Sequence, residues 1–174
     1  MPDAVYFDSC LFIELLQQSD QERFDACEGL RAKAEVGEII IVTSALTITE
    51  VNKLKDSPEL PEVQSRIILA FFENPYIAIR PLDRGIAEYA HELTRTNKLS
   101  NNDAIHVATA IKNKVPVLYT YDSKKGKPKG LTAHHLKIGN PPLRIEIPPD
   151  PDDQSLFSKK AIEDNKVDPF PSNT

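Results

Sequence analysis

Four acidic side chains in this sequence could together bind a divalent cation. Each lies at or near the end of a predicted strand or the start of a predicted helix, and they are Asp8, Glu50, Asp103 and Asp122. The carboxyl ends of parallel strands meet at one edge of an open α/β sheet, where ligands bind, so acids distant in sequence can converge there. Two carboxylates about 4 Å apart repel by roughly 4 kcal/mol at an effective dielectric constant of about 20, so such a cluster needs a proton or a cation. All-oxygen ligation is preferred by Mg²⁺ and Mn²⁺, which are the expected ions.

Each of these acids also has an ordinary structural explanation. Asp8 could cap the helix that follows it, and Asp122 could start a turn. Two pairs have the spacing of a capping box, in which side chains at the first turn satisfy free backbone N–H groups, namely Thr47 with Glu50 and Ser100 with Asp103. Capping is the more frequent role for any single acid, whereas the joint placement of all four favours a cation site.

The elements that must position these acids alternate between strand and helix. Strands are predicted at residues 4–7, 38–43, 77–79, 117–120 and 143–147. Helices are predicted at residues 11–17, 21–34, 46–54, 63–72, 86–93 and 104–111. This alternation indicates a parallel sheet with helices on both faces. Glu14 is expected on the exposed side of the first helix, and Asp83 is expected to cap the helix at 86–93.

Length and composition are those of a globular chain with one main domain. The 174 residues, of which 40% are hydrophobic and 27% charged, are enough for a buried core. The apolar runs, including those at 39–42 and 67–72, are far shorter than the roughly 20 residues of a membrane-spanning helix. No basic segment precedes the first apolar residues, so we expect a cytoplasmic protein that does not contact a membrane. Cys10 and Cys27 are expected to be free thiols.

Charge and proline content divide the chain near residue 148. Residues 148–174 contain six acidic and three basic side chains, so this segment accounts for −3 of the net charge of −5. We therefore expect a domain of residues 1–147, followed by an acidic, proline-containing tail of residues 148–174 that is disordered or lies along the surface. The stretch from 112 to 137 is, in contrast, locally basic, and a polyanion would bind there.

Basic side chains and one histidine lie close to the four acids in sequence. The loop after Asp122 contains lysines that could bind RNA phosphates or be solvated, namely Lys124, Lys125, Lys127 and Lys129. His106 follows Asp103 by three residues and so shares its helical face. This histidine could support a metal-binding acid or contact phosphate, or it could be a hydrogen-bonded core residue, which is the more common case.

Four segments carry the acids in order: YFDS at 6–9, TSALTITEV at 43–51, NDAIHVATA at 102–110 and LYTYD at 118–122. Together they resemble the four motifs of PIN-domain nucleases, and the closest similarity is to VapC-type toxins of bacterial toxin–antitoxin pairs. The resemblance extends over about residues 4–147. Each motif is weak by itself, but four in the right order and spacing are specific.

The resemblance implies a three-layer α/β/α Rossmann-like sandwich with a mostly parallel central sheet, the PIN fold. It also implies an endoribonuclease that needs Mg²⁺ or Mn²⁺ and cuts single-stranded or structured RNA, with Asp8, Glu50, Asp103 and Asp122 as catalytic and metal-binding residues. Ser9 and Thr120, beside these acids, are expected to support them or to contact phosphate. A small antitoxin partner and a homodimer are further expectations from the resemblance alone.

Two other functions remain open at this point. One is a PIN-fold module that binds RNA or protein without catalysis. The other is a phosphatase of the haloacid-dehalogenase kind, which also has an Asp after its first strand, although Cys10 stands where that class has a second Asp. The family often has a further acid shortly after the fourth motif, whereas Ser123, Lys124 and Lys125 follow Asp122 here. This departure leaves the number of bound ions open.

Overall fold

The computed structural model describes residues 1–55, 57–125 and 129–152. The strands are β1 (Asp3–Phe7), β2 (Ile39–Ser44), β3 (Ile77–Arg80), β4 (Val117–Tyr119) and β5 (Arg144–Glu146). The helices are α1 (Ser9–Gln17), α2 (Gln21–Glu35), α3 (Ala45–Glu50), α4 (Pro61–Phe72), α5 (Arg84–Thr96) and α6 (Asn101–Lys112), with a 3-10 turn, η1 (Leu131–His134). The sequence pattern did not predict η1.

The five strands form one sheet in the order β3-β2-β1-β4-β5, and every pairing among them is parallel. Because β1 pairs with β2 on one side and β4 on the other, the order reverses at the boundary between β1 and β4. This topological switch point is where an open α/β sheet forms its ligand crevice. Asp8 directly follows the carboxyl end of β1. Asp122 follows the carboxyl end of β4 after two further residues.

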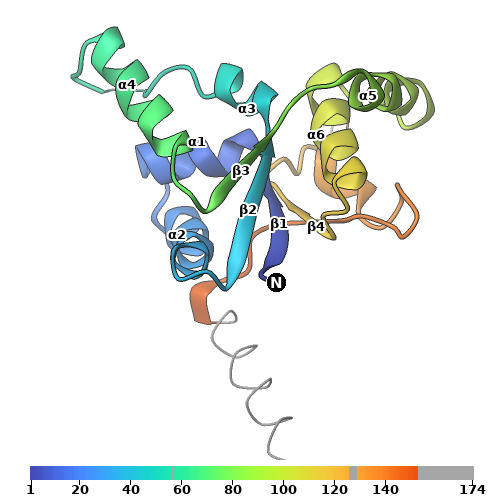
Figure 1. The fold of residues 1–174 in the computed structure, drawn as a ribbon, viewed down its shortest axis with the longest axis horizontal. Helices are drawn as coiled ribbons and strands as arrows, with labels where there is room; N and C mark the ends of the chain where they lie inside the picture. The colour runs from blue at the N-terminus through green and yellow to red at the C-terminus, as the bar shows by residue number, and fades with distance from the viewer. Residues whose placement is uncertain (56, 126–128, 153–174) are drawn as a thin grey trace, which may run out of the picture.

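Helices cover both faces of the sheet (Figure 1). Alternate side chains of a strand point to opposite faces, and the core is accordingly divided into two clusters. On one face Tyr6 and Leu118 pack with residues of α5 and α6. On the other face Phe7 packs with residues of α1, α2 and α4, including Phe12. The predicted three-layer α/β/α fold is thus confirmed.

Side chains cap the starts of α1, α2, α3, α5 and α6, whereas α4 follows Leu60 without a side-chain cap. Asp83 caps α5 as predicted, because its Oδ1 accepts a hydrogen bond from the backbone N–H of Ile86 at 2.8 Å. The alternative explanation of Glu50 as part of a capping box with Thr47 does not hold, since Ser44 caps α3 and Thr47 is buried with its hydroxyl 2.7 Å from that of Thr43. The helix also ends at Glu50 rather than at residue 54.

Glu14 is buried, which corrects the expectation of a surface position. Its side chain is only 5% exposed and accepts two hydrogen bonds, from the backbone N–H of Asp20 and from the hydroxyl of Ser19, both at 2.8 Å. Gln18, in the left-handed region with φ of 51°, ends α1 and turns the chain back over this carboxylate. Glu14 therefore ties the end of α1 to the start of α2.

Replacing Glu14 by Ala should lower the free energy of unfolding by about 1–3 kcal/mol, because buried donors lose their acceptor. Urea denaturation of the full chain measures the effect. Glu92→Ala, at an exposed position of α5, is the matched control and should change stability by less than about 0.5 kcal/mol. Equal stabilities for the two variants would contradict the structural role of Glu14.

Three further expectations concern a membrane-spanning helix, the two cysteines and the C-terminal tail. No helix among residues 1–55, 57–125 and 129–152 is long and apolar enough to cross a membrane. Cys10 and Cys27 are free thiols, as predicted. Of the predicted tail at 148–174, residues 153–174 lie outside the described part of the chain.

Candidate active site

Asp8 stands at the centre of the carboxyl edge of the sheet, between β1 and α1. Its backbone N–H extends the β1–β4 ladder by donating to the carbonyl oxygen of Tyr119 at 3.1 Å. Its carboxylate is buried and is oriented by two short hydrogen bonds, one from the backbone N–H of Ser9 and one from the hydroxyl of Thr120, both at 2.7 Å. Asp8 is the N-cap of α1, so the capping role is real, but it leaves the carboxylate at the switch point.

Glu50 reaches the same region from the last residue of α3. One of its carboxylate oxygens lies 2.7 Å from Nε2 of His106, and the other accepts a hydrogen bond from the Asn102 side chain at 2.8 Å. Nε2 of His106 is also 3.4 Å from Oδ1 of Asp8. Ligand atoms of Asp8, Glu50 and His106 all lie within 4.8 Å of one another, and we call these three residues the tight group.

His106 is buried between Tyr6 and the two carboxylates. Its Nδ1 lies 2.8 Å from the Tyr6 hydroxyl, and its Nε2 faces Glu50 and Asp8, so Nε2 carries a proton and donates to Glu50. Burial opposes the charged imidazolium, but the hydrogen bond to Glu50 and the charge of Asp8 outweigh it and raise the pKa of His106. Burial likewise favours neutral Glu50, yet the hydrogen bonds from His106 and Asn102 lower the pKa of Glu50 on balance. His106 is therefore a hydrogen-bonded core histidine, and it contacts two of the predicted metal ligands.

Asp122 is joined to Asp8 through one hydroxyl group. Thr120 donates to Oδ2 of Asp8 and accepts from the backbone N–H of Asp122 at 3.0 Å. Oδ2 of Asp122 accepts from the backbone N–H of Leu131 at 3.2 Å, whereas Oδ1 is buried without a hydrogen-bond partner in the described part of the chain. A buried acceptor without a partner is costly and points to a bound cation or water.

Asp103 takes part in the predicted capping box and also faces the other acids. The hydroxyl of Ser100 donates to its carboxylate at 2.6 Å and accepts from its backbone N–H at 3.2 Å. Burial raises the pKa of Asp103, and the negative charges of Asp122 and Asp8 raise it further. A divalent cation among these acids would relieve this repulsion, and the oxygen-rich donors suit Mg²⁺ or Mn²⁺. The residues present thus fit such an ion.

The structure therefore brings the predicted residues together unevenly. Asp8 and Glu50 are in the tight group, while Asp103 and Asp122 lie outside it but within electrostatic reach. Ser9 and Thr120 both donate hydrogen bonds to the Asp8 carboxylate. The exposed lysines Lys124, Lys125 and Lys129 flank Asp122 in sequence, whereas Lys127 lies outside the described residues.

Two contacts at this edge were not foreseen. Sγ of Cys10 lies 3.5 Å from Oδ2 of Asp8, and it accepts a hydrogen bond from the backbone N–H of Tyr121 at 3.3 Å. The other is the contact of the Tyr6 hydroxyl, from the core of β1, with Nδ1 of His106 at 2.8 Å. Because side chains alternate along a strand, Tyr6 in β1 and Asp8 just after it point to the same side. This alternation is the only sequence signal that Tyr6 could approach His106 beside Asp8.

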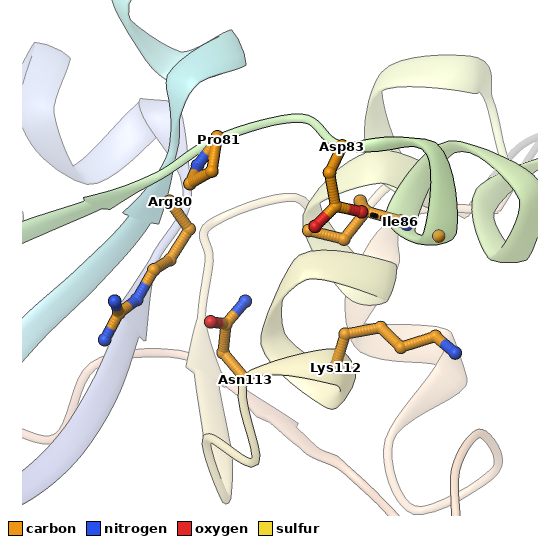
Figure 2. Close-up of a pocket in the computed structure, with 7 residues that line it drawn as sticks. Arg80, Pro81, Asp83, Ile86, Lys112 and Asn113 are labelled. Carbon is orange, nitrogen blue, oxygen red and sulfur yellow. Dashed lines mark hydrogen bonds between the residues drawn. The ribbon is translucent and has the colours of Figure 1, made fainter.

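A separate pocket of about 370 Å³ lies away from the acids, between the end of β3, the start of α5 and the end of α6 (Figure 2). It is lined by Arg80, Pro81, Asp83, Gly85, Ile86, Lys112 and Asn113. Asp83 is already engaged in capping α5, and Asn113 donates to the carbonyl oxygen of Thr109 at 2.8 Å. None of the predicted site residues lines this pocket.

Replacing His106 by Leu should lower the free energy of unfolding by about 1–3 kcal/mol, because the Tyr6 hydroxyl and Glu50 lose a buried partner. Chemical denaturation without divalent ions measures the change. His91→Leu, at an exposed position of α5, is the matched control and should change stability by less than about 0.5 kcal/mol. Equal unfolding free energies for both variants would contradict the central position of His106.

Comparison with known proteins agrees with the predicted family. A toxin–antitoxin complex from Klebsiella pneumoniae contains a chain that is 22% identical, with a TM-score of 0.51 over 69% of this chain and 88% of that chain. VapC20, a sarcin-ricin loop cleaving toxin from Mycobacterium tuberculosis, is 19% identical, with a TM-score of 0.53 over 68% of this chain and 89% of that chain. At these identities the likeness concerns the fold. No curated protein sequence matches the chain.

The PIN domain family, in turn, matches residues 5–127. This range begins in β1 and extends past Asp122, so it contains all four predicted acids and the strands that position them. It also covers more than half of the 174 residues. The predicted family is therefore confirmed, and the chain belongs to the PIN domain family.

Proposed function

We propose that this protein is a metal-dependent endoribonuclease and the toxin of a toxin–antitoxin pair. The observation that carries the proposal is the meeting of Asp8 and Glu50 at the switch point of a PIN sheet, beside a buried Asp122 oxygen without a partner among the described residues. A structural acid would have that oxygen satisfied. We place the activity in residues 1–147 and treat residues 148–174 as an appended segment.

Asp8, Asp103 and Asp122 would hold one or two Mg²⁺ or Mn²⁺ ions, and Glu50 would complete the set. When bound, such an ion lowers the pKa of a coordinated water and stabilises charge on the phosphate and the leaving oxygen. The protein itself fixes the acids: Ser9 and Thr120 orient the Asp8 carboxylate. Burial of Asp8 excludes bulk water from its side of the site.

His106 has a distinct part in this arrangement. Its Nε2–H donates to Glu50 and approaches Asp8, so it holds two carboxylates together that would otherwise repel. An imidazole in this position also keeps the Glu50 carboxylate ionised, which a cation ligand must be.

The substrate we propose is single-stranded or structured RNA. A negatively charged substrate must approach a negatively charged edge, so basic side chains are needed around the acids. The lysines that follow Asp122 would contact RNA phosphates, namely Lys124, Lys125, Lys127 and Lys129. The Mycobacterium tuberculosis relative with the same fold is described as cleaving the sarcin-ricin loop, which supports a ribonuclease role for this chain.

Cleavage of RNA by the full chain with Mg²⁺ or Mn²⁺ tests this function. We expect cleavage with either ion, loss of cleavage in EDTA, and recovery when the divalent ion is restored in excess. Melting temperature should rise with the divalent ion, because an ion that binds only the folded state stabilises it. RNA binding that persists in EDTA, without cleavage under any metal, would instead select a PIN module that binds but does not cut.

An antitoxin partner and a homodimer are part of the same proposal. The Klebsiella pneumoniae structure with this fold is a toxin–antitoxin complex, which supports a small inhibitory partner here. If a short reading frame overlaps this gene upstream, expression of the chain alone should arrest growth and co-expression of that product should relieve the arrest. Normal growth in both cases, together with RNA cleavage in vitro, would indicate a nuclease that is not a toxin.

A further inference from the structure

An arginine is held against an aromatic ring beside the acids. Arg23 lies in the first turn of α2, and its guanidinium carbon is 4.9 Å from the ring centroid of Tyr121. The Tyr121 hydroxyl donates to the backbone carbonyl oxygen of Arg23 at 3.2 Å, so the contact is fixed at two points. The Arg23 side chain is nevertheless 53% exposed, which leaves part of the guanidinium open to a ligand.

This arginine is connected to the site by a short chain of contacts. Tyr121 immediately precedes Asp122, and its backbone N–H bonds Sγ of Cys10 at 3.3 Å. That sulfur is 3.5 Å from the Asp8 carboxylate. Arg23 therefore lies at the rim of the acidic edge, on the face that α1 and α2 cover.

The charge of Arg23 is weakly neutralised compared with that of its neighbour on the same helix. Its ion pair within the described residues is with Asp20, at 3.9 Å, while the Asp20 carboxylate is already the acceptor for the Arg23 backbone N–H at 3.1 Å. Arg31, two turns later, is engaged on both sides by Glu28 and Glu35. Of the two, Arg23 retains the capacity to bind an anion.

We propose that Arg23 binds a backbone phosphate of the RNA substrate, on the α2 side of the acids. This inference rests on the proposed ribonuclease function and adds a substrate contact to it. The planar guanidinium suits a phosphate, and stacking on Tyr121 restricts its motion before RNA binds, which reduces the entropy lost on binding. The sequence placed the lysine contacts in the loop after Asp122, so Arg23 would give the RNA a further attachment on the α2 side of the acids.

Steady-state RNA cleavage and its salt dependence test this contact. Arg23→Ala should raise KM about fivefold to tenfold, as expected for loss of a charged hydrogen bond, and should change kcat by less than about twofold. The slope of log KM against log salt concentration should fall by about 0.7, the value for one phosphate contact on a single strand. Arg31→Ala, the same charge change on the same helix, should leave both quantities as in the wild type. Arg23→Lys, which keeps the charge without the planar group, should fall between wild type and Arg23→Ala.

A binding measurement separates failure of this inference from failure of the proposed function. In the Asp8→Asn background, fluorescence anisotropy with a fluorescein-labelled single-stranded RNA of mixed sequence reports affinity without cleavage. Arg23→Ala should weaken binding about fivefold to tenfold there, and Arg31→Ala should not. Equal affinities for the two arginine variants would overturn the inference even if the wild type cleaves RNA. Selective weakening by Arg23→Ala would support it even if no cleavage is found.

Discussion

Asp8→Asn should reduce kcat/KM for RNA cleavage by at least about a thousandfold, because cation binding contributes several kcal/mol to the transition state and each 1.36 kcal/mol is about a factor of ten. Asn has the size of Asp, and its amide oxygen can still accept from the Ser9 N–H. Its NH₂ group can donate to the Thr120 hydroxyl, whose own proton can turn to Sγ of Cys10. The fold should therefore remain intact. The negative charge at the switch point is lost, and with it a donor that a hard cation prefers.

The measurement is cleavage of a labelled RNA with Mg²⁺ or Mn²⁺, together with calorimetric titration of the ion into each protein. Asp83→Asn is the matched control: Asp83 also caps a helix, and Asn is a comparable cap, so activity and stability should both be preserved. Asp8→Asn should bind the ion more weakly than the wild type and more weakly than Asp83→Asn. Equal cleavage by wild type and Asp8→Asn would remove Asp8 from the mechanism.

Most of the fold followed from patterns that are local in the sequence. The run at 39–42 lies in a parallel sheet covered on both faces, and its side chains pack alternately into the two core clusters, which is why it is continuously apolar. Helix starts at Asp20, Asp83 and Ser100 coincide with side chains that accept hydrogen bonds from backbone N–H groups. Such signals depend on a few neighbouring residues, so they can be recognised in the sequence without knowledge of the tertiary structure.

Features that depend on long-range contacts could not be predicted in the same way. Glu14 falls on the expected polar side of an amphipathic helix, and only the left-handed turn at Gln18 brings Ser19 and Asp20 over it. Thr47 has the spacing of a capping box, yet its hydroxyl is turned to Thr43 inside the fold. In both cases a tertiary contact overrides a valid local preference.

The site shows the same limit more sharply. The recurrence of acids at strand ends predicted which residues approach the edge, because parallel strands share their direction. It did not predict that Glu50 and His106, 56 residues apart, would be hydrogen-bonded while Asp103 stays outside the tight group. The direction of a side chain depends on helix rotation and packing, which spacing alone does not give.

Gly130→Ala should lower kcat about a hundredfold and destabilise the fold by about 1–3 kcal/mol, although the position is far from Asp8 in sequence. A Cβ at Gly130 would lie 2.4 Å from the backbone nitrogen of Lys124 and 2.6 Å from the carbonyl oxygen of Asp122, and 2.8 Å from its carboxylate. The first two neighbours are backbone atoms, so the loop itself must move. With φ of −63°, the backbone conformation of Gly130 is open to any residue, and the reason for glycine here is the close approach.

A shift of the loop at Gly130 would displace Asp122, which is one of the proposed metal ligands. The backbone N–H of Leu131 donates to the Asp122 carboxylate, and Thr132 donates to the Asp122 backbone carbonyl oxygen, so a shift of Gly130 changes both contacts. A displacement of roughly 1 Å of a reacting group can cost about a hundredfold in rate. Metal titration should show the loss as weaker ion binding, which a general loss of stability would not produce at temperatures where the variant is folded.

Gly85→Ala provides the matched control for this prediction. Its added Cβ would lie 3.4 Å from the Asp83 carboxylate, which is ordinary contact, and the position is helical, where Ala is favoured over Gly. Activity should therefore equal that of the wild type, with a slightly higher melting temperature. Full activity and wild-type ion affinity in Gly130→Ala would contradict this prediction, because they would mean that the loop around Gly130 moves without displacing Asp122. Contacts other than those with Leu131 and Thr132 would then have to hold Asp122 in place.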